Sequence, residues 1–552
     1  MERRAMKPNR RTFLTQTALG VAALATAPLL PGCRTAQAIP GQTLGPNHRA
    51  GHWLRGPLPD LTHTAPAETH SAEVVIVGGG IAGLSARRWL AKAGITDVLL
   101  LELEEKTGGN SAAGQNSVSA YPWGAHYLPI PDIRNRELLD FLAEAGSITG
   151  YNQAGLPLYN EYHLCHDPEE RLFINGHWQE GLVPEIGVPT RDRDQIRRFF
   201  AEIETLRQAV GTDGRDAFAI PLDHSSADAR YRNLDMQSFA DYLTQKGFTS
   251  PYLRWYLNYC CQDDYGISLE QTSAWAGLHY FAGRKGRAAN APGSAVLTWP
   301  EGNAFLADQL RQQAETPTCT NTLAFSLEQT ETGVRVLARD LARNRTVAIN
   351  ARTAILATPA FITRRLLGKA APAAAPQPLT HTPWVVANLT VDALPQGPGV
   401  PLCWDNVVYG TDSVGYISAN HQHLHDSPQR VITFYKPLTG HTSAQVSEAR
   451  KRAYGTTREE WITEILAELE TAHPSISQHV QEIDIWVWGH GMAAPAVGAL
   501  WHSNRTVQSQ PIGHSIYFAH TDYSGISIFE EAFYSGIRSA QAILANRQST
   551  AL

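Results

Sequence analysis

The chain has 552 residues, of which 43% are hydrophobic and 18% are charged. This length exceeds one compact domain and predicts at least two domains with a substantial core. The formal net charge of −6 argues against nucleic acid as a partner. The six cysteines do not form the pattern of a disulfide framework, and no His or Cys spacing indicates a metal site.

The N-terminal segment, residues 1–38, is typical of an export signal. Arg10 and Arg11 precede an apolar, Ala/Leu-rich run that ends at Leu30 and is short for a stable membrane span. The segment resembles a twin-arginine signal. This resemblance implies the twin-arginine export machinery as a partner and export of the chain after it has folded.

Two cleavage sites remain open. Residues 30–33 resemble a lipobox, which would leave a lipid on Cys33 as the only attachment to a membrane. The Ala-Gln-Ala sequence at 36–38 would instead release a soluble protein. Either route leads to the periplasm or the outer face of a bacterial membrane. Residues 39–72 are rich in Pro, Gly, Thr and His and predict a tether or an arm that wraps over the surface.

A strand, a glycine-rich turn and a helix follow the predicted arm. Residues 74–77 are a β-branched run and residues 84–93 have a helical pattern. The G-x-G-x-x-G spacing between them allows a sharp turn, close approach to a pyrophosphate and tight packing of helix on strand. A second apolar run ends at Glu102, where a carboxylate would accept hydrogen bonds from a ribose. The dinucleotide-binding residues predicted in this turn are Gly78, Gly79, Gly80, Ala82 and Gly83.

Three further motifs identify the dinucleotide. Gly108, Gly109 and Asn110 resemble the Gly-Gly motif of FAD enzymes, which indicates FAD rather than NAD. An Ala-Thr-Pro turn ends the predicted strand at residues 346–356. Residues 515–540 resemble the C-terminal segment of flavin-containing amine oxidases. Over about residues 73–546 the chain therefore resembles the flavin amine oxidase, protoporphyrinogen oxidase and phytoene desaturase superfamily.

The resemblance implies an α/β fold. A discontinuous Rossmann-like FAD/NAD(P)-binding domain would comprise residues 73–150, 294–365 and 484–546. An inserted α+β substrate domain would comprise residues 151–293 and 366–483. The substrate cavity would lie over the flavin.

The resemblance also implies further cofactor contacts. Gly124 and Ala125 would pass beneath the flavin ring, and Asp522 would bind the ribityl chain. Asp522 lies one position later than the acid of the family, and Asn110 replaces a common arginine. The loop before the last helix, whose N-terminus would face the flavin, adds Ser524, Gly525 and Ile526.

The catalytic residues are harder to predict, because a flavin carries out the hydride transfer itself. Amine oxidases of this superfamily often have a lysine about thirty residues after the Ala-Thr-Pro turn, and Asn388 aligns with it here. An amide offers no positive charge, so fast reaction with oxygen is less expected; the acceptor could be oxygen, a quinone or a protein. The polar candidates to face the flavin are Asn388, His126, His490 and Tyr523.

Three functions remain open at this point. The first is hydride removal from a C–H bond next to nitrogen in a small-molecule amine. The second is a desaturase or dehydrogenase reaction on an apolar ring or chain, and the third is a non-catalytic FAD-binding assembly factor. The aromatic residues between 252 and 281, beside Asp263 and Asp264, could hold an organic cation or form ordinary helix core. Cys260 and Cys261 could be buried thiols or a vicinal disulfide.

Overall fold

The computed structural model describes residues 38–56, 65–314, 316–368, 371, 379–425, 427–501 and 509–551. The predicted twin-arginine motif and Cys33 lie outside these residues. Pro40–Leu552 forms one compact unit. Within the described ranges, no helix is both long enough and apolar enough to cross a membrane.

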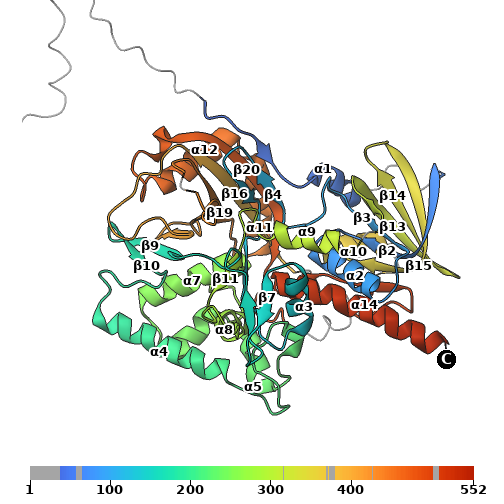
Figure 1. Ribbon diagram of the computed structural model, residues 1–552, viewed down its shortest axis with the longest axis horizontal. Helices are drawn as coiled ribbons and strands as arrows, with labels where there is room; N and C mark the ends of the chain where they lie inside the picture. The colour runs from blue at the N-terminus through green and yellow to red at the C-terminus, as the bar shows by residue number, and fades with distance from the viewer. Residues whose placement is uncertain are drawn as a thin grey trace, which may run out of the picture. The chain divides into compact units, whose positions relative to one another are not determined.

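The first sheet is a mixed sheet of seven strands, and the glycine-rich turn follows its strand β2 (Figure 1). Its order is β12-β3-β2-β15-β14-β13, with β21 paired to β15. Parallel pairing joins β12, β3, β2, β15 and β21, whereas β13, β14 and β15 pair antiparallel. The strands are β2 (Glu68–Val77), β3 (Val98–Leu101), β12 (Thr318–Cys319), β13 (Thr322–Thr330), β14 (Gly333–Asp340), β15 (Arg345–Leu356) and β21 (Ile516–Phe518).

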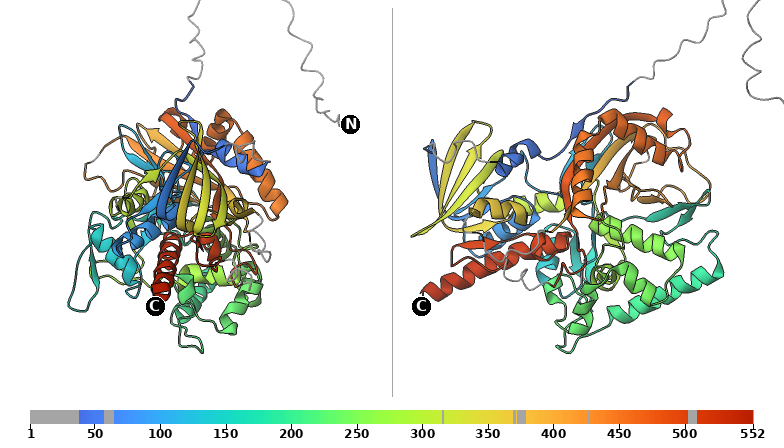
Figure 2. Two further views of the ribbon diagram at one scale, coloured as in Figure 1. Left: turned by 90° about the vertical axis from the view of Figure 1, so that its right-hand side faces the viewer. Right: turned by 180° about the vertical axis from the view of Figure 1, so that it is seen from behind.

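Helices pack beside the first sheet. They are α2 (Ile81–Lys92), α3 (Arg136–Glu144), α9 (Ala304–Gln312), α10 (Ala360–Leu367) and α14 (Phe529–Ala551). Figure 2 shows α14 in red, running out to the C-terminus. It packs closely on α2: a Cβ added to Gly536 would lie 2.2 Å from the Ala82 carbonyl oxygen. This sheet with its helices confirms the predicted α/β class.

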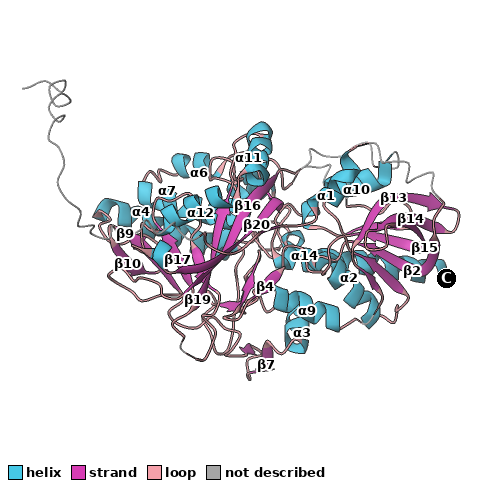
Figure 3. Cartoon of the chain, turned by 90° about the horizontal axis from the view of Figure 1, so that it is seen from above, coloured by secondary structure: helices cyan, strands magenta, loops and turns pink. Residues whose placement is uncertain are grey.

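The second sheet has eight strands in the order β1-β20-β16-β19-β18-β17-β9-β10, and lies apart from the first sheet in Figure 3. Its central strand β16 is buried along its whole length, as expected for a strand covered on both faces. Helices α11 (Ser443–Gly455) and α12 (Arg458–Leu469) accompany it. The strands are β1 (Thr43–Leu44), β9 (Glu170–Ile174), β10 (His177–Glu180), β16 (His381–Val391), β17 (Asp405–Val408), β18 (Tyr416–Ser418), β19 (Arg430–Pro437) and β20 (Val480–Ala493).

A layer of helices shares its hydrophobic core with the second sheet. Phe199, Leu257 and Trp275 from the helices belong to the same buried cluster as Trp384 and Val386 from β16. Cys260 and Cys261 are buried free thiols in α7. The helices are α4 (Thr190–Arg207), α5 (Ala229–Arg232), α6 (Phe239–Gln245), α7 (Pro251–Tyr265) and α8 (Ala274–Ala282).

Three short strand pairs connect these parts. Each is antiparallel, and the pair β6–β11 brings the segment after Ala125 next to the strand that precedes α9. The pairs are β4 (Ala113–Gln115) with β5 (Ala120–Pro122), β6 (Tyr127–Pro129) with β11 (Val296–Thr298), and β7 (Ile148–Tyr151) with β8 (Pro157–Tyr159).

The N-terminal arm, residues 40–56, is bound to the second sheet and to the loop after β3. Its β1 pairs in parallel with β20, and the Gln42 amide donates to Asp484 Oδ1 at 2.9 Å. After β1, the Asn47 amide donates to the Glu104 carboxylate at 2.9 and 3.1 Å. The arm then forms the short helix α1 (His48–Gly51). The tether boundary predicted at residue 72 falls inside β2, and the domain boundary predicted at 483 falls inside β20.

Candidate active site

The turn between β2 and α2 has the geometry that a dinucleotide requires. Gly78 has φ +107°, which favours glycine, and a Cβ on Gly83 would lie 2.0 Å from the Gly78 carbonyl oxygen. A Cβ on Gly80 would meet nothing closer than 3.9 Å, so the space before this residue is open. No side chain caps α2 at Gly80, which leaves its first N–H groups for phosphate oxygens.

Glu102 lies at the end of β3, as predicted. Its Oε2 accepts from the Gly79 amide at 2.7 Å, and its Oε1 accepts from the Glu104 amide at 2.9 Å. Burial raises the pKa of Glu102 above its ordinary value, although these two hydrogen bonds oppose the shift. The carboxylate is thus fixed against the glycine turn. Ala82 lies buried in the first turn of α2.

The second glycine pair brings together the residues predicted to lie under the flavin. Gly108 forms a bridge with Gly80, and Gly109 has φ +59°. The Asn110 side-chain amide donates to the Gly491 carbonyl. The backbone carbonyl of Asn110 accepts from the Ala125 amide at 3.0 Å. A Cβ on Gly124 would clash with that carbonyl at 2.4 Å, so the close approach requires glycine.

Asp522 is a buried acid that the protein itself satisfies. Its Oδ2 accepts from the Ala360 amide at 2.7 Å, and its Oδ1 lies 2.8 Å from His381 Nε2 and 3.1 Å from His520 Nδ1. Burial alone would raise the pKa of Asp522, but the two histidines hold it well below its ordinary value. The carboxylate therefore joins the loop before α14 to α10 and β16. Its ribityl role stays a prediction.

A cavity of about 150 Å³ is lined by strands β16, β19 and β20 of the second sheet, by helices α7, α8 and α14, and by the loops next to them. Of the residues predicted to contact FAD, Asn110, Gly124, Ala125 and Ile526 line this cavity, next to Gly491 and Ser527. Ser524 and Gly525 are not among its lining residues, and the Ser524 hydroxyl donates to Thr521 and Ile526 carbonyls at 3.1 and 3.5 Å. The second sheet and the helical layer contribute mainly aromatic and acidic side chains.

Of the four predicted catalytic residues, His126 lines this cavity. Its ring stacks on Tyr435 at 4.7 Å between centroids. Burial lowers the pKa of His126 to about 4, so the imidazole is neutral at pH 7. A neutral imidazole can hold a proton on one nitrogen and accept one on the other.

The other three predicted catalytic residues lie outside the cavity lining. The buried Asn388 amide donates to the Pro122 carbonyl at 3.1 Å and accepts from the Thr433 hydroxyl at 2.6 Å. The His490 ring packs 4.9 Å from Phe361, and burial followed by nearby Arg450 lowers its pKa to about 3. Tyr523 packs on Phe518 at 5.8 Å. Val386, two residues before Asn388 on the same face of β16, does line the cavity.

Several lining residues were not predicted as site residues. Arg284 Nη2 donates to both Asp264 oxygens at 3.1 and 3.0 Å, and its guanidinium lies 4.2 Å from the centre of the Tyr280 ring. Glu530, in the first turn of α14, is buried, and this burial raises its pKa to about 7. The paired acids 263–264 were visible in the sequence as a cluster, whereas Arg284 and Glu530 belong to no motif.

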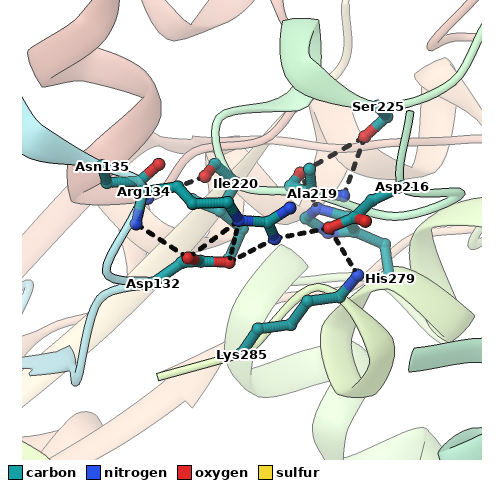
Figure 4. A network of polar contacts seen from close by, with 9 residues as sticks. All are labelled: Asp132, Arg134, Asn135, Asp216, Ala219, Ile220, Ser225, His279 and Lys285. Atoms are coloured by element: carbon teal, nitrogen blue, oxygen red, sulfur yellow. Dashed lines mark hydrogen bonds and ion pairs between the residues drawn. The ribbon is translucent and has the colours of Figure 1, made fainter. Parts of the chain in front are cut away.

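A polar network holds the cavity wall at Ile220 and His279 (Figure 4). Arg134 binds Asp132 and Asp216, and Lys285 Nζ lies 2.8 Å from Asp216. The Asn135 side chain donates to the Ile220 carbonyl at 2.8 Å, and His279 Nε2 lies 2.8 Å from the Ala219 carbonyl. These contacts tie the segment before α3 to the helical layer, so they fix the shape of the cavity.

Comparison with known proteins agrees with this geometry. Residues 76–145 match the family of NAD(P)-binding Rossmann-like domains. Over 86 residues the chain is 38% identical to the mitochondrial dimethylglycine dehydrogenase of Rattus norvegicus, a match that covers 15% of this chain and a tenth (10%) of that enzyme's length.

Solved structures match over most of the chain. A putrescine oxidase variant aligns with a TM-score of 0.63 at 17% identity, over 86% of this chain and 99% of that one. Cyclohexylamine oxidase from Brevibacterium oxydans IH-35A aligns with a TM-score of 0.59 at 16% identity, over 86% and 99% of the two chains. This chain has the fold of FAD-dependent amine oxidases. The dinucleotide-binding segment and this fold indicate FAD as the cofactor, which confirms the prediction.

Proposed function

We propose that the protein is an exported FAD-dependent oxidoreductase that removes a hydride from a C–H bond next to the nitrogen of a small amine. The observation that carries this proposal is the cavity. Residues predicted to contact FAD line one part of it, and aromatic and acidic side chains line the rest. Putrescine and cyclohexylamine, the amines in the names of the similar structures, support the same substrate class. When bound, FAD supplies the acceptor for the hydride.

The residues of the chain have four tasks in this reaction. The glycine turn and the loop at Asn110 bind and orient the cofactor. The rings of Trp384, Tyr435 and Trp488 line the cavity and keep water from the reacting carbon. The N-terminal end of α14, where Phe529 and Glu530 line the cavity, would favour negative charge on a cofactor bound beside it. The neutral His126 lines the cavity and can accept the proton that a bound ammonium group must lose before the neighbouring C–H bond can give up its hydride.

We further propose a quinone or a protein, rather than oxygen, as the main electron acceptor. The support is the lack of a lysine among the described residues that line the cavity. Lys436 follows the lining residue Tyr435 on β19, but adjacent residues of a strand point to opposite faces. Lys436 instead pairs with Glu464 at 2.9 Å and with Glu468.

The test is anaerobic reduction of the purified FAD protein. Cyclohexylamine and putrescine are expected to bleach the flavin absorbance, whereas apolar reductants are not. Bleaching by apolar compounds alone would favour the desaturase reaction, and no bleaching by any compound would favour a non-catalytic assembly factor. Rapid mixing of the reduced protein with oxygen and with a soluble quinone then compares the acceptors, and faster reoxidation by oxygen would contradict the proposed acceptor.

We also propose that the mature protein is in the periplasm or on the outer face of a bacterial membrane. The sequence around Arg10 and Arg11 supports export, and Cys33 supports a lipid anchor. Replacing both arginines by lysine is expected to retain the protein in the cytoplasm. Cys33→Ala is expected to move it from the membrane to the soluble fraction, and an unchanged fractionation would contradict lipidation.

A further inference from the structure

We propose that Asp263 selects the substrate by binding the ammonium group of a protonated amine inside the cavity. This inference rests on the proposed function and names the residue that would make the site specific for a cation. Asp263 lies in the last turn of α7 and lines the cavity.

The adjacent acids 263 and 264 differ in their partners. Asp264 accepts from Arg284, and the Tyr127 hydroxyl donates to it at 3.3 Å. The Asp263 carboxylate has no hydrogen bond or ion pair with another residue in the described part of the chain, and it keeps some surface open to the cavity. One acid of the pair is thus satisfied by the protein and the other is left for a ligand.

The position of Asp263 makes its negative charge costly without a cation. The C-terminal end of a helix carries partial negative charge, and the last turn of α7 contains no basic residue. Arg284 already pairs with Asp264, and Glu530 adds another acid to the same cavity. The carboxylate of Asp405 on β17 and that of Asp263 also repel each other. Desolvation, followed by repulsion from Asp264, raises the pKa of Asp263 to about 7.

The rest of the lining suits an organic ammonium group. Aromatic rings attract cations through their faces, and Tyr265, Tyr280, Trp384 and Tyr435 line the cavity. A metal ion fits less well, because the described residues contain no group of three or more His, Cys, Asp or Glu side chains placed to hold one. A zwitterionic amino acid would bring a carboxylate beside the excess of acids, with a single guanidinium that Asp264 already binds.

The experiment uses the FAD-bound protein and a cation that cannot react. tert-Butylamine has no hydrogen on the carbon next to its nitrogen, so hydride removal is impossible. tert-Butanol has the same shape without the charge. Binding of each is followed through the flavin absorbance spectrum. Wild-type protein is expected to bind the amine about tenfold or more tightly than the alcohol, because hydrogen bonds to charged groups are among the strong ones.

Two matched variants assign this preference to one carboxylate. Asp263→Asn keeps the shape and removes the charge, and it is expected to weaken amine binding about 10- to 100-fold without changing binding of the alcohol. Glu270→Gln makes the same change of charge at an exposed position seven residues later and is expected to bind both compounds as wild type. FAD content and the unfolding midpoint show that each variant is folded.

The outcomes separate this inference from the proposed function. Equal binding of amine and alcohol by wild type, or unchanged amine binding in Asp263→Asn, would overturn the role of Asp263 even if cyclohexylamine reduces the flavin. Charge-dependent binding through Asp263 without reduction by any amine would support the cation site and contradict amine oxidation. Tighter binding of dimethylglycine than of dimethylamine would show that the site takes a zwitterion and would also overturn the inference.

Discussion

Two aspartates, one beside each sheet, show two different uses of a carboxylate. The carboxylate of Asp522, at the first sheet, has partners within the protein: it accepts from the Ala360 amide, and the imidazoles of His381 and His520 lie 2.8 and 3.1 Å away. Asp263, in the helical layer beside the second sheet, has neighbouring acids and no bound donor in the described residues. Their pKa values accordingly move in opposite directions, below the ordinary value for Asp522 and up to about 7 for Asp263.

This difference separates a structural acid from a binding acid. A carboxylate whose donors belong to the protein contributes to folding, whereas one without donors weakens folding and gains its partner on binding. The two can be distinguished by the sign of the stability change when each charge is removed. The following predictions test that distinction, from the largest expected effect to the smallest.

Removing the charge of Asp522 should give the largest loss of stability. Asp522→Asn is expected to lower the free energy of unfolding by about 3–5 kcal/mol, as for breaking a buried ion pair. Because the folded-state pKa is lowered, the loss should be complete at neutral pH and shrink as the pH falls below about 4. Urea unfolding at several pH values measures it. Asp194→Asn, which breaks an exposed pair with Arg197, should change stability by less than about 1 kcal/mol.

Removing the charge of Asp263 should have the opposite sign. Asp263→Asn is expected to raise the free energy of unfolding by about 1–3 kcal/mol at pH 8, because an ionised and desolvated carboxylate is replaced by a neutral amide. The folded-state pKa is raised, so the gain should be absent below about pH 4 and grow as the pH rises to about 7. The same urea series measures it. A loss of stability at pH 8 would place Asp263 with the structural acids.

Cation binding should depend on pH through the same group. An alkylamine, like lysine, stays protonated below about pH 10, so a change between pH 6 and 8 reports on the protein. Wild-type affinity for tert-butylamine is expected to rise about tenfold over this range as Asp263 ionises. Asp263→Asn should show a flat profile. The charged or titratable groups that also act on Asp263 or its immediate surroundings are Tyr127, Tyr259, Cys260, Asp264, Tyr280, Arg284, Asp405 and Tyr435.

The smallest effect concerns reaction with oxygen. Val386 lines the cavity and Asn388 does not, so Val386→Lys is expected to speed reoxidation of the reduced flavin by oxygen several-fold, through a positive charge near the cofactor. Asn388→Lys should give no acceleration, because residue 388 lies outside the cavity lining. This substitution would only remove the hydrogen bonds of the amide with Pro122 and Thr433. Rapid mixing with oxygen measures both rates. Acceleration in Asn388→Lys alone would restore the alignment inferred from the sequence.

The cofactor-binding half could be predicted from the sequence because its determinants are local. The glycines at 78, 80 and 83 and Glu102 lie within 25 residues of one another, and their spacing is dictated by one strand, one turn and one helix. The cavity is different, because Asp263, Tyr435 and Glu530 reach it from three distant elements. Asn388 lies on the same face of β16 as the lining residue Val386, but the point along a strand at which a cavity ends depends on packing that the sequence does not show.

The N-terminal arm has a consequence for the order in which the chain is completed. Gln42 is among the first described residues to be synthesised, yet its amide bonds to Asp484, 442 residues later. A ribosome releases the N-terminal end first, so this end must wait until nearly nine-tenths of the chain has emerged before β1 can join β20. Docking of the arm thus requires a complete second sheet. An export signal that precedes the arm would then be joined to a chain in which residue 42 already contacts residue 484.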